Sequence, residues 1–281
     1  MKRGLERVWR GVRGFEVPAR GASRGGMVLL LCCLLMPLML PVAPGGGQAY
    51  GRAGHSRAEL RVGLSPDVPP LAFRRGERVE GLEVDLAHLL GSEMGRSTRL
   101  VQYEWRELVP ALLAGDVDIL MAGLSVTPAR KVRMAFSQPY LEIRQRALIR
   151  RSDAERLGSA EQLMRADIRM GVLKDSTGDS LVQQQSPQAR KVVYAMPEDA
   201  VWDLGPKRRR IDAFIYDGPA IAWYASEHEA DLVSVDIPSD PEAIAWGLRP
   251  DDEHLLEQVN AALDRMRRDG RLERLVHRWM P

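Results

Sequence analysis

The chain has 281 residues, of which 45% are hydrophobic and 28% are charged, and its formal net charge is +2. This composition is typical of a globular protein of one or two domains, and it excludes a largely disordered or collagen-like chain. The charge is distributed unevenly, because seven basic and only two acidic residues lie within residues 1–49. The rest of the chain has 33 basic and 36 acidic residues, a net charge of −3, which gives no reason to expect a nucleic-acid partner.

Residues 1–49 have the composition of a secretory signal peptide. Basic residues dominate positions 1–26, Met27 to Leu40 is almost entirely apolar, and Pro41 to Ala49 is small and uncharged. A signal peptide has this order, and Gly47-Gln48-Ala49 is an acceptable cleavage site. An uncleaved membrane anchor is the alternative, although the apolar run is shorter than the ~20 residues that a spanning helix needs. We therefore expect a protein exported to the periplasm.

The mature chain offers no obvious reactive group. Both cysteines, Cys32 and Cys33, lie in the apolar run, so removal of the signal peptide leaves no thiol. The histidines are scattered, and there is no His-Glu-x-x-His spacing, no Gly-x-Ser-x-Gly elbow and no phosphate-binding loop. We therefore expect no catalytic residue, no metal site and no cofactor.

Strands and helices alternate through the first half of the mature chain. Short apolar runs predict strands, and apolar residues at helical spacing, ended by glycine, predict helices. The elements predicted here are, in order, a strand at 60–63, a helix after Gly81 that ends near Gly95, a strand at 100–103, a helix from Trp105 to Gly115 and a buried strand at 117–121. This alternation is typical of a sheet covered by helices on its faces.

The second half repeats the same alternation and then returns. The elements predicted here are a strand at 146–150, a helix capped by Ser159 with Gln162, a strand at 168–173, a helix that begins within 174–179, a strand near Val192, a helix from Pro197, a strand at 211–216, a helix through Trp223, a return strand at 244–248 and helices at 252–269 and 272–279. We infer two α/β lobes joined by two strands, with a ligand cleft between them. Lobe 1 spans 58–147 and is completed by 248–281, lobe 2 spans 148–247, and no further domain is expected.

The segment from Gly123 to Arg130 is the strongest local signal for a ligand. It follows the strand at 117–121, and Gly123 lets a ligand approach the main chain closely. Thr127 and Pro128 resemble a helix start, which directs unpaired N–H groups and a positive dipole end forward. Arg130 adds a planar set of donors that matches a carboxylate. The alternative is an ordinary strand-to-helix turn with a surface arginine.

An ordered set of short motifs extends along the chain. They are Pro70, Gly81 with Val84-Asp85-Leu86, Trp105 with Leu108 and Pro110, Gly115 with Asp118, Ser125 to Arg130, Phe136 to Tyr140, Gly171-Val172, Ser176-Thr177, Asp212-Ala213 with Asp217, Asn260 to Leu263, Asp269-Gly270 and Trp279. In this order and spacing the chain resembles the periplasmic solute-binding proteins of family 3, which serve polar amino-acid ABC transporters. The resemblance spans Leu60 to Trp279. It implies a two-lobe, type II periplasmic-binding-protein fold with a two-strand hinge.

The resemblance also implies roles for single residues. Arg130 is expected to clamp the α-carboxylate of an amino acid, assisted by the Gly123 main chain and the Ser125 hydroxyl. Thr177 is expected to donate to the same carboxylate from the second lobe, and Asp217 to accept from the α-ammonium group. The candidate ligand-binding residues are thus Trp105, Gly123, Ser125, Thr127, Arg130, Ser176, Thr177 and Asp217.

Each of these roles has a structural alternative. Thr177 could be only a helix N-cap, and Asp217 could cap the helix that follows it. Trp105 aligns with an aromatic residue that packs against the ligand, but it could equally be part of the core. Two positions depart from the family pattern: Val68 stands where an aromatic is common, and Ser65 where cation-binding relatives tend to have an acid. The preferred ligand side chain is therefore left open.

The expected function is the capture of a small polar amino acid between two hinged lobes, followed by delivery to the membrane permease of an ABC transporter. The expected protein is a monomer. One alternative is a periplasmic enzyme on the same fold, because relatives include a dehydratase of cyclohexadienyl acids. Another is an amino-acid sensor or accessory binding module that has no part in transport. Incubation with arogenate or prephenate separates the enzyme from the binding protein.

Overall fold

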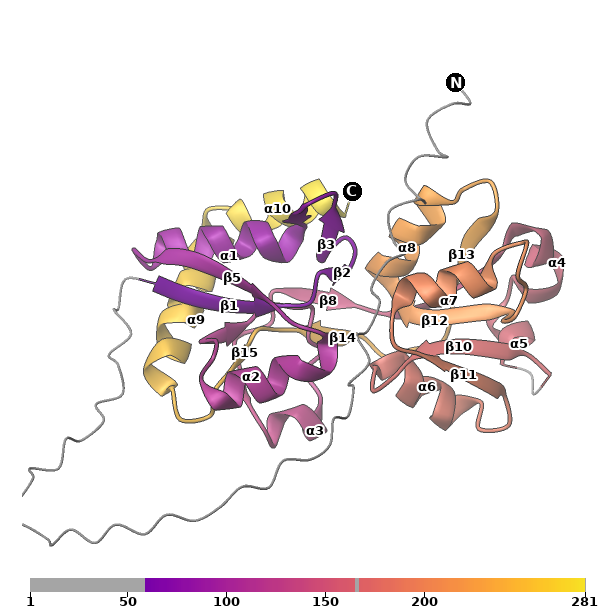
Figure 1. Ribbon diagram of the computed structural model, residues 1–281, viewed down its shortest axis with the longest axis horizontal. Coiled ribbons are helices and arrows are strands. Elements are labelled where there is room, and N and C mark those ends of the chain that lie inside the picture. Colours follow the sequence, from indigo (N-terminus) through magenta and orange to yellow (C-terminus); the bar gives the residue numbers. More distant parts are fainter. Residues whose placement is uncertain (1–58, 165–166, 281) are drawn as a thin grey trace, which may run out of the picture. The chain divides into compact units, whose positions relative to one another are not determined.

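The computed structural model describes residues 59–164 and 167–280, and the predicted signal peptide at 1–49 lies outside these residues. Two five-stranded sheets organise the described chain into two α/β lobes, as predicted (Figure 1). The strand order is β5-β1-β6-β15-β7 in the first lobe and β11-β10-β12-β9-β13 in the second. Within the described ranges, no helix has both the length and the apolar character that crossing a bilayer requires.

The first lobe combines a mixed sheet with helices from both ends of the described chain. Strand β1 is parallel to β5 and β6, and β15 is antiparallel to β6 and β7. A small separate sheet, β2-β3-β4, contacts α1. The elements are β1 (Glu59–Leu64), β2 (Asp67–Val68), β3 (Ala72–Arg75), β4 (Arg78–Glu80), α1 (Leu82–Glu93), β5 (Ser97–Gln102), the 3-10 helix η2 (Trp105–Glu107), α2 (Leu108–Ala114), β6 (Ile119–Leu120), α3 (Pro128–Lys131), β7 (Ala135–Phe136), β15 (Gly247–Leu248), α9 (Glu253–Arg268) and α10 (Arg271–Trp279).

The C-terminal helices pack on α1, so the end of the chain belongs to the first lobe (Figure 1). Helix α9 buries one stripe at helical spacing, which includes Leu255, Val259 and Met266. Polar contacts hold the same surfaces together: Arg265 pairs with Glu93 at the end of α1 at 2.8 Å. The strength of this apolar pattern explains why the sequence predicts both helices correctly.

The second lobe has helices on both faces of its sheet. Strand β10 is parallel to β11 and β12, whereas β9 is antiparallel to β12 and β13. The elements are β9 (Gln145–Arg150), the 3-10 helix η3 (Arg151–Asp153), α4 (Ala154–Leu157), α5 (Ala160–Leu163), β10 (Arg169–Leu173), α6 (Thr177–Gln185), β11 (Arg190–Tyr194), α7 (Pro197–Leu204), β12 (Ala213–Asp217), α8 (Gly218–Glu227) and β13 (Leu232–Asp236).

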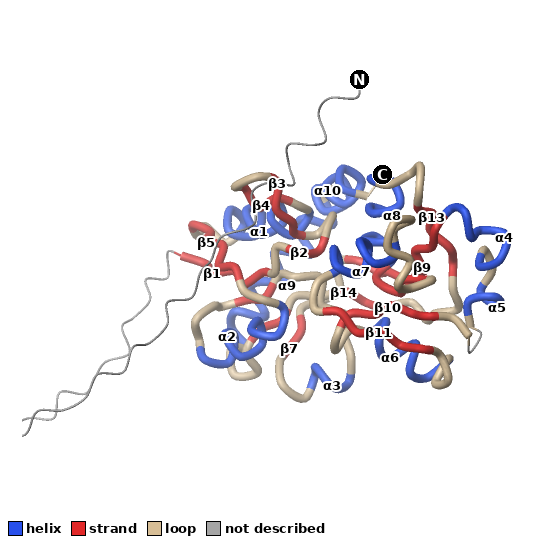
Figure 2. The backbone as a smooth tube through the Cα atoms, turned by 45° about the vertical axis from the view of Figure 1, so that its right-hand side comes forward, coloured by secondary structure: helices blue, strands red, loops and turns tan. Residues whose placement is uncertain are grey.

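Alternation along the central strand β12 divides the core of this lobe. Phe214 and Tyr216 join the apolar cluster that contains residues of α7 and α8. Ala213 and Ile215 point the other way, into the cluster that contains Val182 of α6. Figure 2 shows the strands β10 and β11 between α7 on one side and α6 on the other. A strand buried on both faces reads as a continuous apolar run, which is how this strand is recognised in the sequence.

Two strands connect the lobes. Strand β8 (Leu141–Ile143) pairs antiparallel with β14 (Glu242–Ile244), and each lies between a strand of the first sheet and a strand of the second. The sequence-based boundaries need correction, because 147/148 falls inside β9 and 247/248 falls inside β15. By strand pairing, residues 145–147 lie in the second sheet and Gly247 lies in the first.

Local signals in the sequence have mixed outcomes. Thr127 caps α3 and the Ser159 capping box is present, as predicted. Strand β13 is not predicted at all, and the return strand expected at 244–248 is two separate strands, β14 and β15. Strand β6 is shorter than the predicted run at 117–121. Next to β6, the N–H groups of Asp118 and Met121 still donate to the carbonyl oxygens of Arg61 and Gly63 in β1 at 2.9 Å. The Asp118 carboxylate also binds the Arg61 guanidinium at 2.6 Å.

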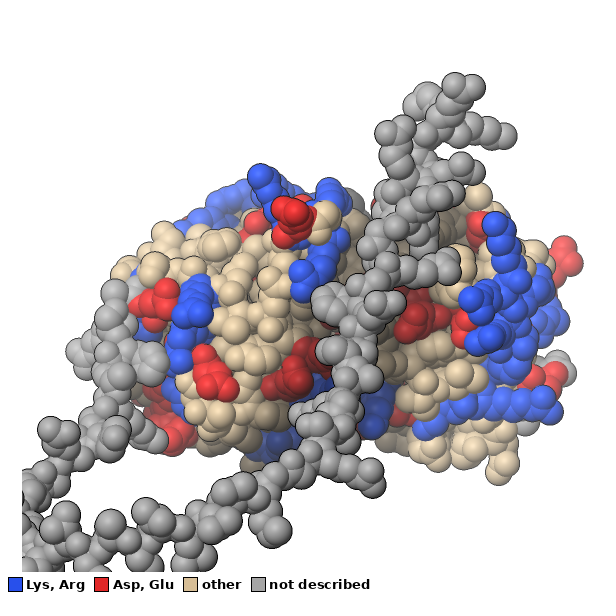
Figure 3. Space-filling view, in the orientation of Figure 1, with Lys and Arg blue, Asp and Glu red and all other residues tan. Residues whose placement is uncertain are grey.

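Basic side chains gather at the right-hand end of the face shown in Figure 3. The run from Lys207 to Arg210 is exposed in the second lobe. Two of its members nevertheless have acidic partners: Arg209 lies 3.1 Å from Asp153 and Arg210 lies 3.8 Å from Asp203. In both pairs the arginine side chain is largely exposed, so solvent screens the attraction although the carboxylates are largely covered.

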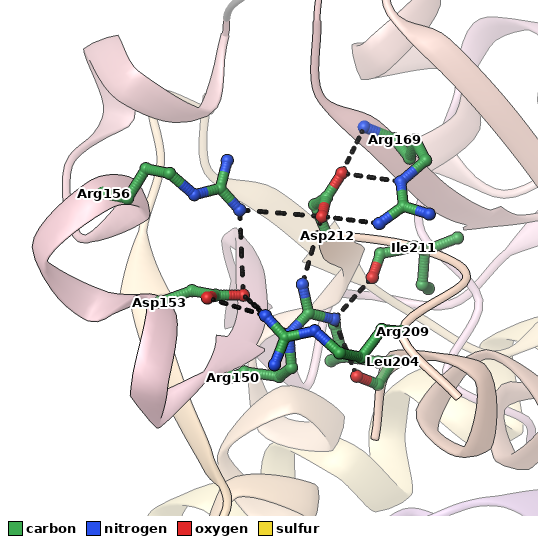
Figure 4. Close-up of polar contacts among 8 residues, drawn as sticks. All are labelled: Arg150, Asp153, Arg156, Arg169, Leu204, Arg209, Ile211 and Asp212. Atoms are coloured by element: carbon green, nitrogen blue, oxygen red, sulfur yellow. Dashed lines mark hydrogen bonds and ion pairs between the residues drawn. The ribbon is translucent and has the colours of Figure 1, made fainter. Parts of the chain in front are cut away.

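A buried arginine lies at the centre of an ion-pair cluster in this lobe (Figure 4). The Arg150 side chain is 1% exposed, and its Nε donates to Asp153 at 2.6 Å. Its Nη2 donates to Asp212 at 3.1 Å. Its Nη1 donates to the carbonyl oxygens of Leu204 and Ile211 at 2.8 and 2.6 Å. All three guanidinium nitrogens therefore have acceptors, which is the condition for burying such a charge without a large penalty.

Further arginines surround the two acids of this cluster. Arg169 donates from Nε to Asp212 at 2.9 Å, and Arg156 lies within 3.7 Å of both Asp153 and Asp212. Burial alone raises the pKa of Asp212, but the hydrogen bonds and charge of Arg169 and the charge of Arg150 lower it to about 2. The Asp212 carboxylate is thus held in the charged form by the neighbouring arginines.

Candidate functional site

The candidate site lies beyond the carboxyl ends of strands from both sheets. Gly123 follows β6, Leu173 ends β10, Ala195 follows β11 and Asp217 ends β12, and all four line one cavity. In open α/β sheets the carboxyl edge is the usual place for a ligand, because loops and helix starts meet there. The residues that line this cavity are Trp105, Gly123, Ser125, Arg130, Leu173, Lys174, Ser176, Thr177, Ala195, Tyr216 and Asp217.

Seven of the eight residues proposed from the sequence line this cavity. The eighth, Thr127, lines an adjoining groove together with Trp105, Arg130 and Thr177. The Thr127 hydroxyl accepts from the Arg130 N–H at 3.3 Å as the cap of α3. Helix α3 has only four residues, so the position of Arg130 is a better reason for anion binding here than the helix dipole.

Arg130 stands on the first-lobe side of the cavity with much of its donor capacity unused. Its Nη1 donates to the Ser125 carbonyl oxygen at 2.9 Å, and its Cζ lies 5.5 Å from the centre of the Trp105 ring. Among residues 59–164 and 167–280, no carboxylate forms an ion pair with it. Burial lowers the pKa of Arg130, while the charges of Asp217 and Glu242 raise it. A planar donor group held by an aromatic face and one carbonyl is suited to a carboxylate guest.

Gly123 and Ser125, which precede Arg130 in the cavity wall, have different structural roles. Gly123 has φ of +65°, and a Cβ atom there would lie 2.3 Å from Leu71 Cδ1, so both backbone and space require glycine. Its N–H donates to the Glu83 carboxylate at 2.7 Å and is therefore not available to a ligand, contrary to the expectation for its main chain. Ser125 is buried, and its carbonyl oxygen orients Arg130.

On the second-lobe side, Ser176 and Thr177 begin α6. The N-cap is Ser176, whose hydroxyl accepts from the Asp179 N–H at 3.0 Å. The alternative in which Thr177 is the N-cap is therefore wrong. The Thr177 hydroxyl instead accepts from Gln145 Nε2 at 3.0 Å, at the edge of the cavity.

Asp217 is the buried acid of the site, with 7% of its surface exposed. It precedes α8, but its side chain makes no capping hydrogen bond, so the capping alternative is also wrong. Its Oδ1 accepts from Gln145 Nε2 at 2.7 Å. Burial, together with the charge of Glu242, raises the pKa of Asp217 to about 6, although the Gln145 hydrogen bond and the charge of Arg130 lower it. A cation bound beside this carboxylate would restore its ionised form.

Gln145 and Glu242 belong to the site but are absent from the sequence-based set. The Gln145 amide contacts Glu242 Oε1 at 3.0 Å as well as Asp217 and Thr177. Gln145 reaches the site through strand register, because β9 pairs with β12 so that Gln145 lies directly opposite Asp217. Glu242 begins β14, in the connection between the lobes. In the sequence, Gln145 is only a polar residue at the edge of an apolar strand. Such a residue does not identify a site unless the pairing of that strand is known.

Comparisons with known proteins agree with this architecture. The chain matches the family model of bacterial extracellular solute-binding proteins, family 3, over residues 60–281. It is 27% identical over 237 residues to ABC transporter arginine-binding protein 1 of Escherichia coli (strain K12), covering 81% of this chain and 93% of that protein. It is 28% identical over 244 residues to the glutamate-binding protein GluB of Corynebacterium glutamicum, covering 82% and 81%.

A solved structure of an amino acid-binding protein is similar to this chain. The ancestral amino acid-binding protein AncCDT-1, a precursor of cyclohexadienyl dehydratase, has a TM-score of 0.73 to this chain at 30% identity, and the match covers 80% of this chain and 96% of that one. The family model covers more than half of the chain, and the two-lobe fold agrees with it. The chain therefore belongs to the bacterial extracellular solute-binding proteins of family 3.

Proposed function

We propose that this protein captures a small polar amino acid between its two lobes and delivers it to the permease of an ABC transporter. One observation carries the proposal, a cavity lined by both lobes with opposite charges on its two sides. On one side lies Arg130, which forms no ion pair with a carboxylate of residues 59–164 or 167–280, and on the other lies the buried Asp217. An amino acid carries the complementary charges at a fixed short separation. The names of relatives that bind arginine and glutamate support the same class of ligand.

In this proposal each end of the zwitterion has its own partner. Arg130 binds the α-carboxylate through a pair of N–H donors, and the hydroxyls of Ser125 and Thr177 add hydrogen bonds. Asp217 accepts from the α-ammonium group. Gln145 and Glu242 lie beside Asp217, so they define how closely the ammonium group can approach. The ring of Trp105 packs against the ligand and against Arg130.

Hinge motion follows from the position of these groups. A ligand favours a closed form only if it contacts that form better than the open one, and groups on both lobes satisfy this requirement. The strands β8 and β14 are the connection about which the lobes would turn. We propose that the closed form is the one that the permease recognises.

The side chain of the ligand is less constrained than its zwitterionic part. Residue 65 is a serine, and its hydroxyl donates to the Asp67 carboxylate at 3.2 Å. An acid is therefore present close to residue 65, although residue 65 itself is not one. Val68 is buried and offers no aromatic wall. We therefore propose a polar amino acid without restricting the charge of its side chain.

The remaining parts of the proposal concern location and partners. The segment 1–49 is proposed to direct export to the periplasm, with an uncleaved anchor as the alternative. The partner is the membrane permease, and the working form is a monomer. The charge of the remaining chain gives no support for a nucleic-acid partner.

We propose a binding protein rather than an enzyme. The structural similarity to AncCDT-1 makes dehydration of a cyclohexadienyl acid the reaction to test. Incubation with prephenate and with arogenate should give no aromatic product. Formation of phenylpyruvate or phenylalanine above the background rate would replace the binding role with a catalytic one.

A thermal-shift screen tests the binding function. The protein expressed from the full coding sequence is heated with each of the twenty standard L-amino acids, because a ligand that binds only the folded state raises the melting temperature. At 100 times Kd the stabilisation is about 2.7 kcal/mol. One or a few polar amino acids should give a shift that Arg130→Ala abolishes. No shift with any of them would contradict the proposal.

A further inference from the structure

A buried carboxylate lies behind the loop that forms the first-lobe wall of the cavity. Glu83 is the second residue of α1 and is 0% exposed. Its Oε1 accepts from the N–H of Gly123 at 2.7 Å and from the hydroxyl of Tyr140 at 2.6 Å. Its Oε2 accepts from the indole Nε1 of Trp246 at 3.0 Å. One side chain therefore joins three segments that are far apart in the sequence.

These three segments are the ones on which ligand binding and closure depend. Gly123 begins the loop that leads to Ser125 and Arg130. Tyr140 directly precedes β8, and its N–H donates to the Ile244 carbonyl oxygen in β14 at 2.9 Å. Trp246 follows β14. The carboxylate thus contacts the ligand loop and the first-lobe end of each connecting strand.

The surroundings of Trp246 make this arrangement rigid. The rings of Tyr140 and Trp246 stack with their centres 5.3 Å apart. The Ser137 hydroxyl accepts from the Trp246 N–H at 3.0 Å, and the Ser137 N–H donates to the Trp246 carbonyl oxygen at 2.9 Å. Trp246 itself is fully buried. If the end of β8 or of β14 rotates, Tyr140 and Trp246 therefore move together and not one by one.

An acid is an expensive choice for this position if packing were its only purpose. Glu83 lies on the same face of α1 as the buried Ala87 and Leu90, where an apolar side chain fills space without desolvating a charge. Burial raises the pKa of Glu83, although the Tyr140, Gly123 and Trp246 hydrogen bonds lower it. What the carboxylate provides, and an apolar residue does not, is a fixed direction for three donors.

We propose that Glu83 is a positioning residue that sets the ligand loop at Gly123 in register with both connecting strands, so that the site has its binding geometry when the lobes close. The inference rests on the proposed function, because it assigns Glu83 a role in the binding of an amino acid. Glu83 touches no ligand, and it acts through Gly123, Tyr140 and Trp246.

The test compares two identical substitutions in one helix. In Glu83→Gln the amide oxygen can still accept hydrogen bonds, as one carboxylate oxygen did. The new NH₂ group cannot accept, so it faces an N–H or O–H donor and one of the three contacts is lost. In the matched control, Glu93→Gln, the change is at the other end of α1, where Glu93 pairs with Arg265 and Arg271 and does not line the cavity. Wild type and both variants are made from the full coding sequence.

Two quantities are measured for each protein: the melting temperature without ligand, and Kd by calorimetry for each standard L-amino acid that shifts the wild-type melting temperature. We expect Glu83→Gln to raise Kd at least tenfold and Glu93→Gln to change it less than twofold, although both lower the melting temperature. A purely structural role of Glu83 would lower the melting temperature and leave Kd unchanged, and that result would overturn the inference. If wild type itself binds none of the twenty, the proposed function fails first.

A milder variant covers the case in which Glu83→Gln does not fold. Tyr140→Phe removes one donor and keeps the ring that stacks on Trp246. We expect a rise in Kd of about threefold with a folded protein. An unchanged Kd in this variant would overturn the inference in the same way.

Discussion

Two arginines, one in each lobe, are withdrawn from solvent in different ways. Arg150 directs every nitrogen of its guanidinium to an acceptor, two carboxylates and two carbonyl oxygens (Figure 4). Arg130 directs one nitrogen to the Ser125 carbonyl oxygen and lies on the Trp105 ring. Arg150 ends strand β9, and Arg130 lies in the short helix α3. Of these two, only Arg150 has, among the described residues, an acceptor from its own lobe for every nitrogen of its guanidinium.

Under the proposed function, Arg150 is a charge that holds the fold together and Arg130 is a charge that binds the ligand. A buried cation with a complete set of acceptors holds its surroundings together, and its removal leaves anions without compensation. A cation that faces a cavity, opposite the acid Asp217, keeps donors for a group that arrives from outside. The comparison predicts that the two arginines control different quantities, the stability of the fold and the affinity for an amino acid.

The largest effect should come from Arg150→Met. Loss of the cation leaves Asp153 and Asp212 partly uncompensated, and breaking a buried pair in this way costs about 3–5 kcal/mol. For a domain of this size the melting temperature should fall by roughly 6–20 °C. Thermal unfolding measures this directly. A fall of less than 2 °C would mean that the surrounding arginines, such as Arg169, already neutralise both acids.

Arg130→Ala should have the complementary phenotype. Because closure buries the ligand carboxylate beside this side chain, its loss should weaken binding by roughly 2–5 kcal/mol, which is about 30- to 5,000-fold in Kd. The melting temperature without ligand should change little. Lys131→Ala is the matched control, since Lys131 is exposed on the same short helix and does not line the cavity. Equal affinities of wild type and Arg130→Ala by calorimetry would remove Arg130 from the site.

Acidification should weaken binding through Asp217. Its pKa is raised from 3.8 to about 6, so the anion that accepts from an ammonium group is present above pH 6 and is lost as the pH falls. Between pH 7.5 and pH 5, Kd should rise about tenfold, since one pKa unit is a factor of ten in the ionised fraction.

Asp217→Asn is the control for this pH dependence. It should bind weakly and with nearly the same Kd at both pH values. Stability without ligand should move in the opposite sense, because a raised pKa of an acid makes folding less favourable as the pH rises from about 4 to about 6. A pH dependence of Kd that persists unchanged in Asp217→Asn would assign the titration to another group.

The smallest effect should come from Trp105→Leu. The indole face holds the Arg130 guanidinium, and an interaction of this kind is worth about 0.5–1 kcal/mol at a partly exposed site. A rise in Kd of about two- to fivefold is expected, with the core contacts of η2 largely kept by leucine. A rise of more than fiftyfold would indicate that the ring contributes to affinity mainly through its contact with the ligand and not through Arg130.

The fold was accessible from the sequence wherever periodicity is strong. The stripe of α9 and the apolar run of β12 identify a helix and a buried strand without further information. Strand β13 was not predicted because it is only partly buried, and its pairing with β9 decides its structure. The same is true of β14 and β15, which are separated by Ala245 and Trp246 and pair with different partners.

The candidate site was accessible only in part. Residues within one local motif, such as Arg130 and Thr127, could be named because the motif resembles a known family. Gln145, Glu242 and Glu83 could not, since each acquires its role from a partner far away in the sequence. For Glu83 a weak signal exists: an acid on the same helical face as Ala87 and Leu90 conflicts with an apolar stripe.

The decisive measurement is a crystal structure of the protein with the amino acid that gives the largest thermal shift. We expect the ligand carboxylate on Arg130, with N–H···O distances of about 2.7–2.9 Å, and the ligand ammonium on Asp217. Both lobes should contact the same ligand. A ligand that binds with its carboxylate away from Arg130, or that contacts one lobe alone, would show that the two lobes do not capture an amino acid in this way.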